Sequence, residues 1–172
     1  MKKALLALLL PLVFATAAHA QAPAGYAALP IDSATQKVTY RGAIALPPGT
    51  TQAQAYGRAK LWLADVFASK ALIADDAASG LLSGGGIVLV RDFSYLFRVR
   101  LQVESNQVRY RLDDFTWQTN GGRSTSDRGT AEEQRDSKMG IGKGLRAKML
   151  AEMDAKVREG LAKLKSELGG NL

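Results

Sequence analysis

The chain has 172 residues, a formal net charge of +7 and no cysteine. This length supports one domain that holds together by its hydrophobic core, and the lack of cysteine excludes disulfides, thiol nucleophiles and thiolate metal sites. The positive charge is moderate: it is typical of ordinary solubility or of contact with anionic lipid or polymer, and is weaker than in a dedicated nucleic-acid binder.

Residues 1–20 have the pattern of a secretory signal peptide, with two lysines, an apolar run and a small-x-small cleavage site that ends at Ala20. The apolar run is too short for a stable membrane span. We therefore expect cleavage after Ala20 and a periplasmic or secreted product without a transmembrane segment. The one histidine, His19, leaves with the signal, and loss of the two lysines lowers the net charge from +7 to +5. Histidine-based triads and zinc sites are then excluded as well.

Residues 21–35 are rich in alanine and proline and lack periodicity, which predicts a flexible leader before a single domain at residues 36–172. Residues 37–46 alternate between apolar and polar, which is the period of a half-buried strand. A Pro-Pro-Gly sequence ends this strand.

A helix is predicted next, because Thr51 and Gln54 have the spacing of a capping box. Apolar residues follow at intervals of three and four, so they share one helical face: Tyr56, Ala59, Trp62, Leu63, Val66 and Phe67. An aromatic stripe at this spacing is more often core than ligand site, so we expect it to pack against a sheet.

Two strands are predicted at residues 71–75 and 87–90, with a turn at Ser79-Gly80 between them. The three glycines at residues 84–86 lack the lysine and hydroxyl residue of a phosphate-binding loop. We interpret them as a bulge or a tight bend.

Residues 98–114 predict a hairpin with a two-residue turn at Ser105-Asn106. In this register, apolar residues pair on one face: Val103 with Val108, Leu101 with Tyr110, and Val99 with Leu112. Polar residues pair on the other face: Gln102 with Arg109, Arg100 with Arg111, and Arg98 with Asp113. The apolar face continues at its ends in Phe97 and Phe115.

Four arginines line the polar face of this hairpin: Arg98, Arg100, Arg109 and Arg111. A solvated sheet face explains their alternation, because arginine covers apolar neighbours while its charge stays in water. However, Arg100 opposite Arg111 is a like-charge pair, which is unfavourable where it stands. Two interpretations remain, a solvated face and an anion-binding face.

Residues from about 118 to 142 are mostly polar, which predicts a long mobile loop. An amphipathic helix follows, with its apolar stripe at Leu145, Met149, Met153, Val157, Leu161, Leu164 and Leu168. Acidic residues among its lysines argue against a membrane-surface helix. We expect it to dock on the sheet.

Three stretches together, "VTYRGAIALPPGTTQAQAYGRAKLWLADVF", "ALIADDAASGLLSGGG" and "YLFRVRLQVESNQVRYRLDDF", resemble the domain of unknown function 4468 family. These are exported bacterial proteins described as having a TBP-like fold. The resemblance covers residues 37–117 and implies an α+β domain of order β-α-β(4)-α, a curved antiparallel sheet with two helices packed on one face. The chain departs from the family pattern at the Ser105-Asn106 turn and in the longer segment 118–142.

The family carries no assigned activity or binding residues that could be transferred, and a shared fold does not transfer DNA binding. The sequence therefore predicts an exported, non-catalytic binding or interaction module with no cofactor. The partners considered are anionic lipid, an envelope polymer or another envelope protein, and no nucleic acid is expected. A filled interior would favour an interaction module, and an apolar cleft on the order of several hundred Å³ would favour a small ligand.

Two alternatives stay open. The first is a carboxylate-dependent hydrolase that uses Asp75 with Asp76, or Asp113 with Asp114. Neighbouring residues on a strand point to opposite faces, which argues against either pair as a catalytic dyad. The second is a structural or assembly protein that engages a partner through its C-terminal helix.

Overall fold

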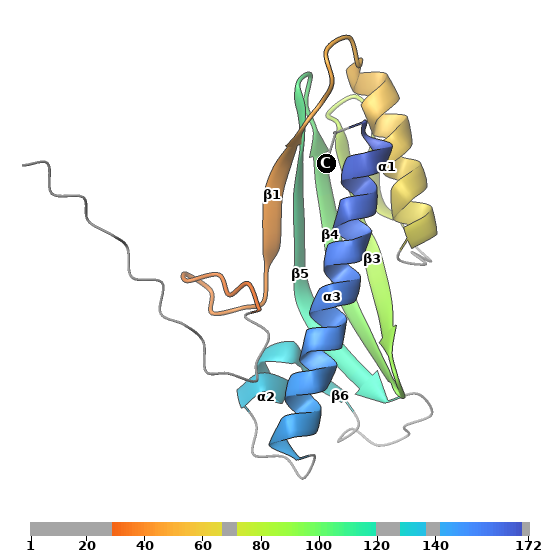
Figure 1. Cartoon of the computed structure of the whole chain (residues 1–172). Coiled ribbons are helices and arrows are strands. Elements are labelled where there is room, and N and C mark those ends of the chain that lie inside the picture. Colours follow the sequence, from red (N-terminus) through yellow and green to blue (C-terminus); the bar gives the residue numbers. More distant parts are fainter. Residues whose placement is uncertain (1–28, 67–71, 120–127, 137–141, 170–172) are drawn as a thin grey trace, which may run out of the picture.

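The computed structural model describes residues 29–66, 72–119, 128–136 and 142–169. Its elements in chain order are β1 (Tyr40–Ala45), α1 (Gln52–Val66), β2 (Leu72–Asp76), β3 (Leu81–Val90), β4 (Phe93–Val103), β5 (Gln107–Thr119), β6 (Arg128–Thr130), α2 (Ala131–Asp136) and α3 (Lys143–Glu167). The strands form one antiparallel sheet of order β1-β5-β4-β3-β2, and β6 pairs with β5 (Figure 1). The predicted α+β class and curved sheet are confirmed.

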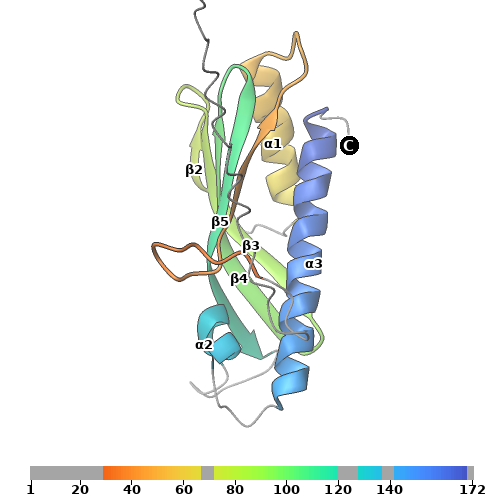
Figure 2. The same cartoon turned by 60° about the vertical axis from the view of Figure 1, so that its left-hand side comes forward.

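Helices α1 and α3 lie side by side on one face of the sheet, which we call the inner face (Figures 1 and 2). The Trp62 indole donates a hydrogen bond of 2.8 Å to the backbone carbonyl of Gly160 and so joins the two helices. The space between helices and sheet is filled by fully buried side chains: Trp62, Leu63, Leu82, Tyr95, Leu101, Leu112, Phe115, Met149, Leu150, Met153 and Leu164. The predicted apolar stripe of α3 is therefore core from Met149 onward and is not a free arm for a partner, whereas Leu145 at its start is exposed.

The predicted capping box at the start of α1 is confirmed. The hydroxyl of Thr51 accepts the backbone N–H of Gln54 at 3.2 Å, and the Gln54 side-chain carbonyl accepts the N–H of Thr51 at 3.0 Å. Each bond satisfies a donor that the first helical turn leaves without an intrahelical partner.

The β4–β5 hairpin has the predicted register at every pair from Val103 opposite Val108 to Arg98 opposite Asp113. The backbone N–H of Glu104 bonds the carbonyl of Gln107 at 2.8 Å and closes the two-residue turn. The register is readable from sequence because a slip by one residue would move every apolar side chain to the solvent face.

A β-bulge at Asp114 interrupts this regular pairing. The register shifts between Leu96 and Arg98, and Asp114 has φ of +57°. The extra residue sends Asp113 and Asp114 to the same outer face and returns Phe115 to the inner face, where it stacks on Phe97 with centroids 4.8 Å apart. The expectation that these two aspartates point to opposite faces is therefore wrong.

The glycine cluster lies within β3, which pairs with β4 without a register shift from Leu81 to Val90. On its other side the predicted irregularity is present, because the register of β2 against β3 shifts between Leu72 and Ala74, opposite Gly84 and Ser83. A Cβ at Gly86 would meet the Phe97 ring at 2.4 Å, whereas a Cβ at Gly85 would meet nothing within 4 Å. Gly86 therefore gives the aromatic ring its place on the inner face.

Part of the segment predicted as a loop at about residues 118–142 forms regular structure. Strand β5 continues to Thr119, and residues 128–136 form β6 and α2; residues 120–127 and 137–141 lie outside the described residues. The Gln134 side chain is buried and accepts a 2.7 Å hydrogen bond from the Tyr95 hydroxyl. A polar segment can thus close this end of the core, because the side-chain carbonyl of Gln134 finds a buried partner there.

The last residues of the segment predicted as a leader, residues 21–35, also pair with the domain. Residues 30–32 pair with residues 37–39, through bonds from Thr39 N–H to the Pro30 carbonyl (2.8 Å) and from Asp32 N–H to the Lys37 carbonyl (2.9 Å). The predicted signal peptide and residues 21–28 lie outside the described residues. Within the described ranges, no helix is long and apolar enough to cross a membrane.

The close approach at Gly86 gives a first prediction. Replacing Gly86 by alanine should lower the free energy of unfolding by about 1–3 kcal/mol, because the new methyl group displaces the Phe97 ring in a packed core. The matched control is Gly85→Ala, which should change stability by no more than about 0.5 kcal/mol. Urea denaturation followed by tryptophan fluorescence measures both. Equal losses in the two variants would contradict the packing role of Gly86.

Candidate functional site

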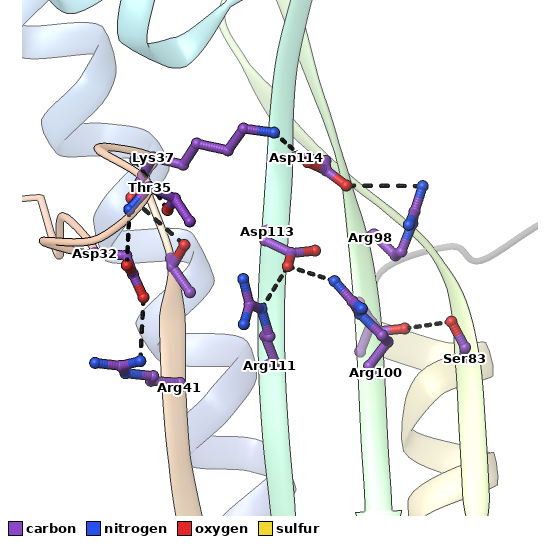
Figure 3. Close-up of polar contacts among 12 residues, drawn as sticks. Asp32, Thr35, Lys37, Arg41, Ser83, Arg98, Arg100, Arg111, Asp113 and Asp114 are labelled. Atoms are coloured by element: carbon purple, nitrogen blue, oxygen red, sulfur yellow. Dashed lines mark hydrogen bonds and ion pairs between the residues drawn. The ribbon is translucent and has the colours of Figure 1, made fainter.

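Three arginines form a row across the outer face, which is the sheet face opposite α1 and α3. Arg41 of β1 lies opposite Arg111 of β5, and Arg111 lies opposite Arg100 of β4. Neighbouring strands are about 4.8 Å apart, so the row brings three guanidinium groups together over a short distance. Figure 3 shows them on the side of the sheet away from α3.

Asp113 lies beneath this row and joins two of its three arginines. Its Oδ2 accepts hydrogen bonds of 2.5 Å from Nη2 of Arg100 and Nε of Arg111, and its side chain is only 3% exposed (Figure 3). The like-charge pair of Arg100 and Arg111 is therefore bridged by a shared carboxylate. Its predicted penalty is offset by two charge-assisted hydrogen bonds.

Asp114, turned outward by the bulge, binds a second pair of cations. Its carboxylate lies 2.9 Å from Nζ of Lys37 and 3.7 Å from Nη2 of Arg98. The hydrogen bond from Lys37 lowers the pKa of Asp114 below its ordinary value.

Asp32 anchors the outer end of the row. Its Oδ1 accepts the backbone N–H groups of Ala34 (3.0 Å) and Thr35 (3.1 Å), and its Oδ2 lies 3.1 Å from Nη1 of Arg41. The bonds from Thr35 and Ala34 lower the pKa of Asp32, so it stays ionised beside Arg41.

Arg109 stands apart from the other predicted arginines. It lies on the same face, two residues nearer the hairpin turn than Arg111. Its Nε is 3.2 Å from a carboxylate oxygen of Glu104. The structure thus brings together Arg98, Arg100 and Arg111, as predicted, but leaves Arg109 in a separate ion pair.

We call these three neighbouring groups of ion pairs the arginine network; its members are Lys37, Arg41, Arg98, Arg100, Arg111, Asp32, Asp113 and Asp114. Five cations face three carboxylates, so the network has a surplus charge of +2. A guanidinium has five N–H donors, and the carboxylates take few of them. The network can therefore accept an oxoanion at its solvent side.

An apolar hollow borders the network on the same face. Its volume is about 370 Å³, and its lining includes Ile73, Ile87 and Leu96 next to Arg98 and Asp114. Ile73 is 66% exposed. Aliphatic and cationic side chains are therefore neighbours on one exposed surface.

The aspartates Asp75 and Asp76, considered above as a catalytic pair, bond to different partners. Asp75 faces the inner side, where it accepts hydrogen bonds from Lys60 (2.5 Å) and Tyr56 (2.7 Å), while Asp76 bonds Ser79 in the following turn. The bond from Lys60 lowers the pKa of Asp75, and the bond from Ser79 lowers that of Asp76. Among the described residues, no three His, Cys, Asp or Glu side chains cluster as metal ligands.

Sequence reasoning missed Lys37, Arg41 and Asp32 as members of the site. Arg41 alternates outward on its strand, but its neighbourhood depends on the pairing of β1 with β5, across more than sixty residues of chain. The sequence contains one indication of the bulge. Residue 114, which has a positive φ, is an aspartate, and aspartate tolerates that conformation better than most residues.

Two solved structures share the fold of this chain. A TBP-like protein from Parabacteroides distasonis ATCC 8503 has a TM-score of 0.63 at 12% identity, covering 84% of this chain and 99% of that one. A DUF4468 family protein from Bacteroides ovatus ATCC 8483 has a TM-score of 0.58 at 14% identity, covering 81% and 92%. The TBP-like fold implied by the sequence resemblance is confirmed. No family model and no curated protein matches the chain.

Because Asp113 is buried, removing its two arginine partners should cost more stability than removing Asp113 itself. Replacing both Arg100 and Arg111 by glutamine leaves Asp113 buried without a counter-charge, which should cost about 3–5 kcal/mol of stability. Replacing Asp113 by asparagine leaves two arginines that water reaches, which should cost about 1–2 kcal/mol.

Chemical denaturation measures this difference, with Arg109→Gln as the control that leaves the network intact. That control should change stability by no more than about 0.5 kcal/mol. If the Asp113 variant were the less stable of the two, Asp113 would not be the buried centre of the network.

Lys37→Gln should lower stability in a pH-dependent way. The folded-state pKa of Asp114 is below its unfolded value, so the ion pair stabilises the fold above the ordinary aspartate pKa of about 4 and loses its effect as the pH falls through the lowered value. Both side chains are more than a third exposed, so the difference from wild type should be about 0.2–1 kcal/mol at pH 7. It should vanish in acid.

The matched control for this measurement is Lys163→Gln on α3, because among the described residues Lys163 has no ion pair. Its stability should follow the wild-type pH profile. Urea midpoints between pH 7 and pH 2 report both variants. A Lys37 effect that does not depend on pH would contradict the pairing with Asp114.

Proposed function

We propose that this protein is an exported, non-catalytic binding module that attaches to anionic phospholipid surfaces through its outer sheet face. The observation that carries the proposal is the arginine network, with its surplus of two positive charges beside an exposed aliphatic patch. Export rests on the signal-peptide pattern of residues 1–20.

Magnitudes support the combination of charge with apolar contact. A basic residue near an anionic membrane contributes about 1 kcal/mol, so a surplus of two charges gives about 2 kcal/mol, which is weak by itself. Full burial of one aliphatic side chain such as Ile73 adds about 1.5–3 kcal/mol. A soluble anionic polymer would use the charge but would leave the aliphatic patch exposed. The pairing of the two therefore favours a lipid surface.

The non-catalytic part of the proposal rests on how the reactive groups are used. The chain from Gln21 onward contains neither histidine nor cysteine. The four aspartates considered as catalytic pairs, namely Asp75, Asp76, Asp113 and Asp114, are all held by cations or by a turn. A catalytic base or acid needs a free carboxyl group directed into a pocket.

The test removes the surplus charge without disturbing the buried carboxylate. Replacing Arg41 and Arg98 by glutamine takes the network from +2 to neutral and leaves both partners of Asp113 in place. The double variant Lys156→Gln/Lys163→Gln is the control, because it removes the same charge from α3. Co-sedimentation with vesicles of phosphatidylglycerol and phosphatidylcholine measures binding.

Wild type and the α3 control should bind at low salt and be released as the salt concentration rises, since a Debye length of about 8 Å at physiological ionic strength screens surface charges. The Arg41/Arg98 variant should bind at least tenfold more weakly, and Ile73→Asn should weaken binding as well. Equal binding by the network variant and the α3 control would refute the proposal. Binding only to an anionic polymer in solution would also refute it.

A further inference from the structure

A groove separates the edge strand β1 from the C-terminal half of α3, and it is distinct from the outer face. Its volume is about 760 Å³, and its lining includes Ala43, Ala45 and Leu46 on one side and Leu161 and Lys165 on the other. This volume is within the range of about 300–1,000 Å³ that is typical of ligand sites.

The two sides of the groove meet at both ends. At one end the Tyr40 hydroxyl donates a 2.7 Å hydrogen bond to Asp154 of α3. At the other end α3 stops against the turn after β1, where a Cβ on Gly169 would lie 3.1 Å from Pro47. The groove between these contacts is therefore a built feature of the fold.

The backbone of β1 has unpaired polar groups at the sheet edge that borders this groove. Leu46 N–H bonds the carbonyl of Asn106 on the β5 side at 2.8 Å, which shows that even-numbered residues of β1 bond β5. The odd-numbered residues Ala43 and Ala45 consequently direct their N–H and C=O groups to the free edge. Nothing in the described part of the chain bonds these groups.

The same edge already accepts a strand at its other end. Residues 30–32 of the chain pair with residues 37–39 through the bonds to Pro30 and from Asp32 described above. This pairing stops before Arg41. The edge is thus competent for strand addition, and the part that borders the groove is unused.

Cations surround the groove. Among the described residues, Lys165 and Arg58 have no ion pair, and the Arg58 guanidinium lies 3.6 Å from the position of a Cβ on Gly169. Arg158 lines the groove and is paired with Asp154 at 2.8 Å. The groove therefore has an excess of positive charge, which complements an acidic ligand.

We infer that the groove binds an extended acidic peptide segment of a partner protein, which adds as a strand to the free edge of β1. Main-chain hydrogen bonds to Ala43 and Ala45 would supply affinity, and contacts with Leu161 and Lys165 would select alternate side chains. An acyl chain would cover the free N–H and C=O groups without bonding them, which is costly. A second copy of this chain would bring its own Lys165 and Arg158 against the same cations.

Ala43→Pro tests the backbone part of this inference, because it removes an N–H group that points away from β5 and leaves the β1–β5 bonds intact. Proline is tolerated on an edge strand in that position. The control is Ala43→Val, which keeps the N–H group. The probe is a phage-displayed library of random heptapeptides, selected on the wild-type protein, with the affinity of selected synthetic peptides then measured by fluorescence polarisation.

Selected peptides should be acidic and should bind Ala43→Pro at least tenfold more weakly than wild type and Ala43→Val. Lys165→Glu should weaken them to a similar extent, whereas Lys163→Glu on the same helix should not. Unchanged circular dichroism and urea midpoints show that the variants are folded. No enrichment, or peptides that bind Ala43→Pro normally, would overturn the inference.

Two further outcomes distinguish other occupants of the groove. A dimer in analytical ultracentrifugation that Ala43→Pro dissociates would assign the edge to a second copy and overturn the peptide inference. A fatty acid that binds regardless of Ala43→Pro and blocks peptide binding would assign the groove to an acyl chain. Vesicle binding by the outer face is independent of all these results, so the two proposals fail separately.

Discussion

The β-bulge at Asp114 determines which side chains of the longest strand pair face the helices and which face solvent. On the inner side it returns Phe115 to the core, where its ring stacks on Phe97 and lies 5.5 Å from the ring of Tyr40. On the outer side it places two carboxylates next to each other beneath the arginines. One extra residue thus serves the aromatic core and the charged face together, because the inserted residue reverses the alternation of everything after it.

The charged face shows how a sheet can hold several arginines at once. A carboxylate that is almost fully buried bridges two of them, and both arginine side chains stay partly exposed to water. Such a network stabilises the sheet and still has positive charge in excess. Stability and the proposed binding therefore depend on different members: Arg100 and Arg111 hold Asp113, whereas Arg41 and Arg98 can be changed with less effect on the fold.

The two proposed surfaces use different chemistry. The outer face offers side-chain charge and aliphatic contact, which suits a surface without fixed sequence. The β1 groove offers backbone hydrogen bonds and positions for alternate side chains, which suits a peptide. The groove lies at the edge of the sheet and the arginine network on its outer face, so the two proposed ligands would not compete for one surface.

The amino-acid sequence by itself determined the capping box of α1, the register of the β4–β5 hairpin, the core stripe of α3 and three of the arginines in the network. These features depend on residues close together in the chain, where periodicity and turn length leave few choices. Only the tertiary structure decided that β1 lies beside β5, that the bulge turns Asp114 outward, that residues 128–136 close the core, and that β1 has a free edge beside α3. The physical reason is that these features depend on contacts between residues far apart in sequence, whose pairing no local pattern encodes.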